Sequence, residues 1–70
     1  MGHHMRLKVD GMGCQGCVDA VRRALAGVPG VDSARVDLAA GQAEVDAAQR
    51  VPTALLVEAV ESVGYEARPA

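Results

Sequence analysis

Residues 6–25 read RLKVDGMGCQGCVDAVRRAL, and the spacing of the apolar side chains changes part-way along this stretch. Over residues 6–10, apolar and charged residues alternate, which is typical of a half-buried β-strand. From about Gln15 the apolar residues recur at helical spacing, at Val18, Val21, Leu25 and Val28. The stretch therefore predicts a strand and a helix joined by a glycine-rich loop that carries two cysteines.

The same two spacings recur in the rest of the chain. Alternation returns from Val31 to Leu38 and again from Gln42 to Ala47, with residues 39–41 suited to a short hairpin turn. Pro52 suits the first turn of a second helix, and Gly64 suits the left-handed position that ends one. The apolar stripe expected on this helix is Leu55, Leu56, Ala59, Val60 and Val63. Residues 65–68 can form a last short strand.

The expected order is strand, helix, strand, strand, helix, strand. With right-handed crossovers this order predicts a ferredoxin-like α+β sandwich, a four-stranded antiparallel sheet with two helices on one face. In that topology Tyr65 lies next to the cysteine loop, although nearly fifty positions separate them. His3 and His4 precede the first strand at the opposite end, roughly 15–20 Å from the thiols. They are therefore poor candidates for ligands of the same ion.

Length, composition and charge limit the possible functions. Seventy residues allow a single domain with a thin core. The net charge of −2 lacks the basic excess typical of nucleic-acid binding, and no apolar run is long enough to cross a bilayer. The first residues, Met1-Gly2-His3-His4-Met5, have no hydrophobic segment behind them and resemble the remnant of an expression tag. We expect residues 1–4 to be such a remnant and residues 5–69 to be one cytoplasmic domain.

The cysteine loop carries the chemistry. It reads Gly11-Met12-Gly13-Cys14-Gln15-Gly16-Cys17 and lies between the first strand and the first helix. The free N–H groups at a helix N-terminus favour anions, so thiolates are stabilised there. Thiolates are soft donors that select Cu(I), Hg(II) or Zn(II) over magnesium and calcium. A two-residue spacer lets Cys14 and Cys17 converge on one metal ion.

The number of ligands separates these metals. Structural zinc takes four ligands and catalytic zinc three, whereas no His, Asp or Glu falls between Gly11 and Val18. Two thiolates suffice for Cu(I), so we expect Cu(I) on Cys14 and Cys17, with Hg(II) chemically possible and Zn(II) less favoured. No nucleophile–base pair, phosphate loop or paired carboxylates indicate an enzyme.

This loop resembles the Gly-Met-x-Cys-x-x-Cys motif of heavy-metal-associated domains, and the resemblance extends over residues 5–69, including the pair Gly64-Tyr65. It implies a ferredoxin-like fold, Cu(I) bound by Cys14 and Cys17, and Met12 as a residue that braces the loop. Tyr65 is similar to the residue of bacterial copper chaperones at this position. Gly16 departs from those chaperones, several of which have histidine there.

The resemblance further implies a copper metallochaperone that delivers its ion to a heavy-metal P-type ATPase, or to the metal-binding domain of one. We expect a monomer without metal and allow for a metal-bridged dimer. Three alternatives stay open: a regulatory module excised from such an ATPase, a mercury-binding homologue, and a thiol oxidoreductase. Arg22 and Arg23, on the exposed face of the first helix, either steer docking onto an acidic partner or form an ordinary solvated surface.

Overall fold

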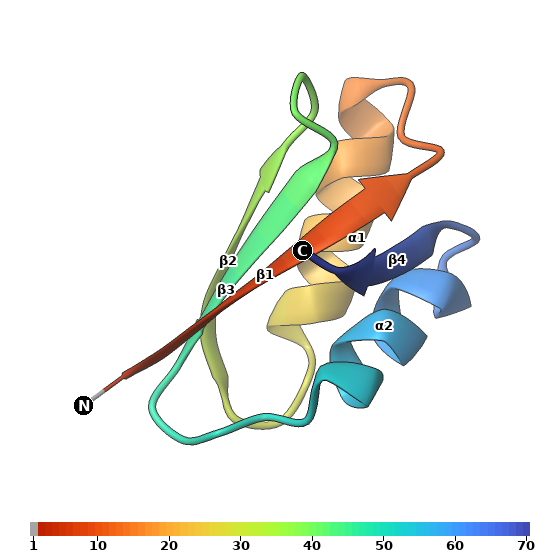
Figure 1. Cartoon of the computed structure of the whole chain (residues 1–70). Coiled ribbons are helices and arrows are strands. Elements are labelled where there is room, and N and C mark those ends of the chain that lie inside the picture. Colours follow the sequence, from red (N-terminus) through yellow and green to blue (C-terminus); the bar gives the residue numbers. More distant parts are fainter. Residues whose placement is uncertain (1) are drawn as a thin grey trace.

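The computed structural model describes residues 2–70, and these residues form six elements in the expected order. The elements are β1 (His3–Asp10), α1 (Gln15–Ala26), β2 (Val31–Asp37), β3 (Gln42–Ala47), α2 (Thr53–Ser62) and β4 (Glu66–Pro69). The strands pair in the order β2-β3-β1-β4, and every pair is antiparallel. Both helices lie on the same side of the sheet (Figure 1). The predicted ferredoxin-like sandwich is confirmed.

The core lies between the sheet and the two helices. Alternate residues of the central strands point into it, and helical residues three or four positions apart meet them. Its largest fully buried side chains are Leu7, Val21, Leu25, Val45, Leu56 and Val60. No buried polar or charged residue interrupts this cluster within residues 2–70. The charged side chains of the described residues therefore all reach the surface.

Strand β1 begins earlier than the alternation predicted. His3 and His4 pair with Ala47 and Asp46 of β3, and Met5 packs against the core. β1 therefore includes residues 3 and 4, which the alternation of side chains did not place in a strand, because antiparallel pairing uses backbone N–H and C=O groups that every non-proline residue carries. Whether residues 1–4 derive from a tag stays a prediction, and Met1 lies outside the described residues.

Three apolar residues that the periodicity places on the core-facing side of their elements are instead exposed to solvent. Leu55 of α2 and Val63, the C-cap residue of this helix, are 42% and 40% exposed, whereas Leu56 is fully buried. The helix contacts α1 and β4 most extensively and β1 only slightly, so a narrow row centred on Leu56 and Val60 reaches the core. Leu38, expected to share a strand face, lies just beyond the end of β2 and is 39% exposed.

Three connections meet at one end of the molecule: the loop from β1 to α1, the hairpin turn from β2 to β3, and the turn from α2 to β4 (Figure 1). The Val9 N–H donates a 2.8 Å hydrogen bond to the Gly41 carbonyl and so ties the hairpin turn to the end of β1. Asp10 pairs with Glu66, which brings the residues just beyond them together. Across residues 2–70, neither helix has the length and apolar character needed to span a membrane.

Candidate metal centre

The two cysteines lie where the loop becomes α1. Cys14 is the N-cap residue, with extended backbone angles, and its Sγ accepts a 3.3 Å hydrogen bond from the Cys17 N–H. The Cys14 carbonyl accepts hydrogen bonds from the N–H groups of Cys17 and Val18 at 3.1 and 3.2 Å. Cysteine is not among the preferred N-cap residues, so the sequence did not signal this role. The cap places Cys14 at the positive end of the helix.

The two sulfur atoms face each other. The Sγ atoms of Cys14 and Cys17 are 2.6 Å apart, and both cysteines are free thiols. Cys14 is exposed and Cys17 half-buried, so the pair opens to the surface. Within residues 2–70, no three His, Cys, Asp or Glu side chains come together in a group able to hold a metal ion. Of these four residue types, the described part of the chain therefore brings only the two thiols together at this end.

Cys17 ionises more readily than an ordinary thiol. Its pKa falls from 9.0 to about 7, mainly because Cys14 hydrogen-bonds to it, with smaller contributions from Tyr65 and the Gly13 backbone. The same contact raises the pKa of Tyr65, because its phenol then hydrogen-bonds to Cys17 and lies beside negative charge. Near neutral pH, a large fraction of Cys17 is therefore in the thiolate form that binds metal.

Tyr65 lies beside the cysteine loop, as the topology predicted. It lies in the turn between α2 and β4, directly before β4, and packs, half-buried, against the core. A Cβ atom placed on Gly11 would lie 3.3 Å from the Tyr65 Cδ1, so the ring lies next to the start of the loop. Met12 is half-buried and also packs against the core. This packing agrees with Met12 acting as a brace for the loop.

The histidines lie away from the thiols. His3 and His4 begin β1, whereas the cysteine loop follows its last residue, Asp10. Together with residues 50–53 they line a hollow of about 240 Å³ at their own end. The His4 Nε2 lies 3.8 Å from a carboxylate oxygen of Glu44. Neither histidine is brought near the cysteine pair.

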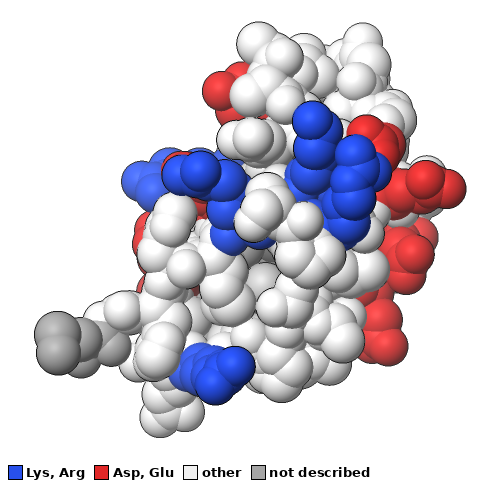
Figure 2. Space-filling view, viewed as in Figure 1, with Lys and Arg blue, Asp and Glu red and all other residues white. Residues whose placement is uncertain are grey.

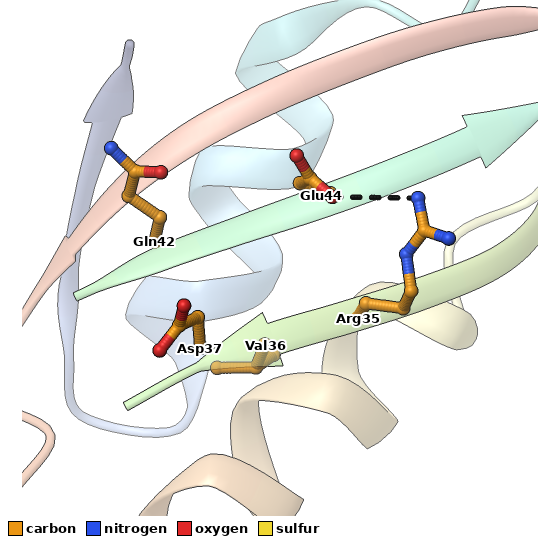
Figure 3. A pocket seen from close by; sticks show the side chains of 5 residues that line it. All are labelled: Arg35, Val36, Asp37, Gln42 and Glu44. Atoms are coloured by element: carbon orange, nitrogen blue, oxygen red, sulfur yellow. Dashed lines mark hydrogen bonds and ion pairs between the residues drawn. The ribbon is translucent and has the colours of Figure 1, made fainter. Parts of the chain in front are cut away.

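The open face of the sheet carries a network of paired charges. Glu44 accepts hydrogen bonds from Arg6 at 3.3 Å and from Arg35 at 3.4 Å. It also lines a hollow of about 150 Å³ in which Arg35 reaches toward it (Figure 3). Figure 2 shows basic and acidic side chains next to one another in the upper part of this face. These groups neutralise one another, and the hollow contains no thiol.

Comparison with known proteins agrees with this geometry. The sequence model of the Heavy-metal-associated domain matches residues 6–66, which include both cysteines and Tyr65. The chain belongs to the heavy-metal-associated domain family. The family resemblance predicted from the loop motif is thereby confirmed. This heavy-metal-associated domain has one cysteine, Cys14, at the N-cap of α1 and the other, Cys17, in the first turn of that helix.

The relatives include stand-alone proteins and pieces of larger ones. The copper chaperone CopZ of Staphylococcus haemolyticus is 43% identical, over 89% of this chain and 93% of its own length. A solved structure described as the CopZ metallochaperone is 36% identical with a TM-score of 0.88, covering 94% of this chain and all of its own. A probable copper-transporting ATPase, PacS of Synechocystis, is 40% identical over 97% of this chain but 9% of its own. The chain spans 6–12% of the first curated relatives it matches, so it corresponds to one small part of them.

Proposed function

We propose that this chain is a Cu(I) metallochaperone that carries the ion on the thiolates of Cys14 and Cys17. The observation that carries the proposal is the pair of free thiols, 2.6 Å apart at an exposed helix N-terminus. A site of two soft donors matches Cu(I), whereas zinc is held by three or four protein ligands. Hg(II) also accepts two thiolates and is the competing ion. Similarity to CopZ over nearly the whole chain supports copper.

The exposed position of the thiols suits transfer of the ion. Cys14 is exposed, so a thiolate of a docked partner can approach the ion from solvent. The incoming thiolate adds to the ion first, giving three sulfur ligands, and one bond to Cys14 or Cys17 then breaks. Together the two steps replace one Cu–S bond by another, so the oxidation state of copper does not change and no oxidant or reductant is needed. The proposed role is binding and transfer of the ion, not catalysis of a reaction.

The proposed recipient is the metal-binding domain of a heavy-metal P-type ATPase. Thiols must stay reduced to act in this way, which fits a cytoplasmic location. We further propose that the metal-free protein is a monomer and that two copies can share one ion through four thiolates. Because PacS contains a matching segment, a metal-binding module of such an ATPase is the second candidate. Both candidates use the same two ligands.

The ligands are tested by competition for Cu(I) with a coloured chelator under reducing conditions. Wild type should withdraw one Cu(I) per chain, and the double variant Cys14→Ser/Cys17→Ser should withdraw none. Ser33→Ala is a suitable control, because the Ser33 hydroxyl on β2 donates a hydrogen bond to Asp46 on β3, and neither residue belongs to the cysteine loop. Stoichiometric binding by the double variant would overturn the proposal. Parallel titrations with Zn(II) and Hg(II) decide the preferred ion, and sedimentation decides the oligomeric state.

A further inference from the structure

The end of the molecule that carries the thiols is uncharged in sequence. This thiol end consists of the three connections that meet there (Figure 1), residues 11–17, 38–41 and 63–65, and none of them contains Lys, Arg, Asp or Glu. Of the three exposed large hydrophobic residues among residues 2–70, Leu38 and Val63 lie in these connections. The third, Leu55, lies about 12 Å along α2 from Val63. Exposed apolar groups therefore gather at the end that carries the open pair of thiols.

The two apolar residues of the thiol end are held by an ordered backbone. The Leu38 carbonyl accepts a 3.3 Å hydrogen bond from the Gly41 N–H across the hairpin turn. The Asp37 Oδ1 accepts a 3.1 Å hydrogen bond from the Ala40 N–H in the same turn. Val63 is the C-cap residue of α2. Contact with a partner would therefore cost these segments little conformational entropy.

The margin of the thiol end is acidic. On both sides of each connection, the first charged residue met along the chain is Asp or Glu, and these residues are Asp10, Asp19, Asp37, Glu44, Glu61 and Glu66. Three of them, Asp37, Glu61 and Glu66, are exposed and take part in no ion pair within residues 2–70. We call these three residues the acidic rim. Figure 2 shows acidic groups on either side of the uncharged upper end of the molecule.

The exposed arginines of α1 lie further from the thiols. Arg22 and Arg23 are about 10–12 Å along the helix from Gln15, where α1 begins. Arg22 lies 3.8 Å from Asp19, and Arg23 is in the last turn, where a cation interacts favourably with the negative end of the helix dipole. Lys8 lies on β1 and not in a connection. The unpaired charge that borders the thiol end is therefore negative.

We propose that the thiol end docks onto a partner domain whose own contact surface has an apolar centre and a margin of Lys and Arg side chains. The inference rests on the proposed function, because the ion is handed over at this end. Leu38 and Val63 are the apolar contacts, and the acidic rim steers the partner's cations into place. A Cu(I) ion on two thiolates has a net charge of −1, which adds to this attraction. Two copies of the chain bring like charges together, so their association should strengthen as salt screens the rim.

The test uses a second copy of this chain as a recipient of defined charge. Glu61→Lys/Glu66→Lys gives the recipient a basic margin around the same apolar centre. The matched control, Asp32→Lys/Ala48→Lys/Gln49→Lys, adds the same four positive charges at the opposite end, where β2 begins and β3 ends. All five substituted side chains are exposed, so both variants should fold. Each isotope-labelled, metal-free recipient is mixed with Cu(I)-loaded wild type, and native mass spectrometry reads which chain holds the ion.

The basic-rim recipient should take up Cu(I) at least about 10-fold faster than a wild-type recipient in about 0.1 M salt, and the difference should shrink as salt is added. The control recipient should stay within about 2-fold of wild type, because charges more than about 10 Å apart are largely screened under these conditions. In the donor, Leu38→Ser and Val63→Ser should each slow transfer about 5-fold. Leu55→Ser, at an equally exposed position away from the thiol end, should not.

A copper-free readout keeps this inference separate from the proposed function. The reduced thiols are treated with cystamine, a disulfide dication, and with dithiodiglycolate, a disulfide dianion. The ratio of the two rates should fall at least about 3-fold in Glu61→Lys/Glu66→Lys and should not fall in the matched control.

Equal uptake by the basic-rim and control recipients would overturn the inference, as would an unchanged ratio of the two disulfide rates. Equal effects of Leu38→Ser and Leu55→Ser on transfer would also overturn it. A wild-type protein that binds no Cu(I) would instead overturn the proposed function, and the charged disulfides would then still test the acidic rim.

Discussion

Alkylation of Cys17 by iodoacetamide should show a midpoint near pH 7. The perturbation is the pH, varied from 5 to 10 on the reduced, metal-free protein. Hydrogen bonding from Cys14 first, and from Tyr65 and the Gly13 backbone next, lowers the pKa of Cys17 from 9.0 to about 7. Each contact favours the thiolate, which is the form that reacts with iodoacetamide.

The size of the effect follows from these two pKa values. At pH 7 about half of Cys17 is thiolate, against about one hundredth of a thiol with the ordinary value of 9.0. A less basic thiolate is also a weaker nucleophile, by about 6- to 10-fold over this interval. The folded protein should therefore react roughly 5- to 8-fold faster at pH 7 than its urea-unfolded form. Above about pH 8.3 the order should reverse, because enough of the more basic thiol is then ionised for its greater reactivity to outweigh its smaller thiolate fraction.

Fragment-ion mass spectrometry assigns the label, because Cys14 and Cys17 fall on the same tryptic peptide, residues 9–22. Tyr65→Phe should raise the midpoint, since it removes one of the contacts that lower the pKa of Cys17. Met12→Leu keeps the packing of the loop and serves as a control. A Cys17 midpoint near 9 in the folded wild type, or one that does not move in Tyr65→Phe, would refute this reasoning.

Three further outcomes are expected. Leu56→Ala should lower the free energy of unfolding by about 2–5 kcal/mol in urea titrations, whereas Leu55→Ala, at the neighbouring exposed position, should change it by less than about 1 kcal/mol; equal losses would contradict the assigned faces of α2. The lowered pKa of Cys17 contributes stability that is lost as pH falls from 9.0 through about 7, and the raised pKa of Tyr65 contributes stability that is lost as pH rises beyond 10.0, so thermal melting of the reduced protein should show both slopes. Glu44→Gln removes a carboxylate shared by two exposed arginines. It should lower the free energy of unfolding by less than about 1 kcal/mol per ion pair, and by less still in high salt. A loss of several kcal/mol would contradict the assignment of these charges to a surface network.

Much of the candidate site could be predicted because its signals are local. The change of apolar spacing around the cysteine loop places α1 at Gln15, where the structure has it. The spacing of Cys14 and Cys17 across that helix start brings the sulfurs together without help from distant residues. The position of Tyr65 beside the loop also followed from the sequence, because the order of elements decides which connections meet at one end.

The sequence by itself therefore determined the order of the elements, the place of the two thiols and the position of Tyr65 beside the cysteine loop. The tertiary structure alone decided that β1 begins at His3, since backbone pairing with β3 leaves no mark on side-chain spacing. It also decided that Leu56 and not Leu55 is buried, because this depends on how α2 is rotated against its neighbours. The contact between Gly11 and the Tyr65 ring belongs here too. The spacing of apolar residues describes one short segment at a time, whereas such contacts depend on the register between segments far apart in the chain.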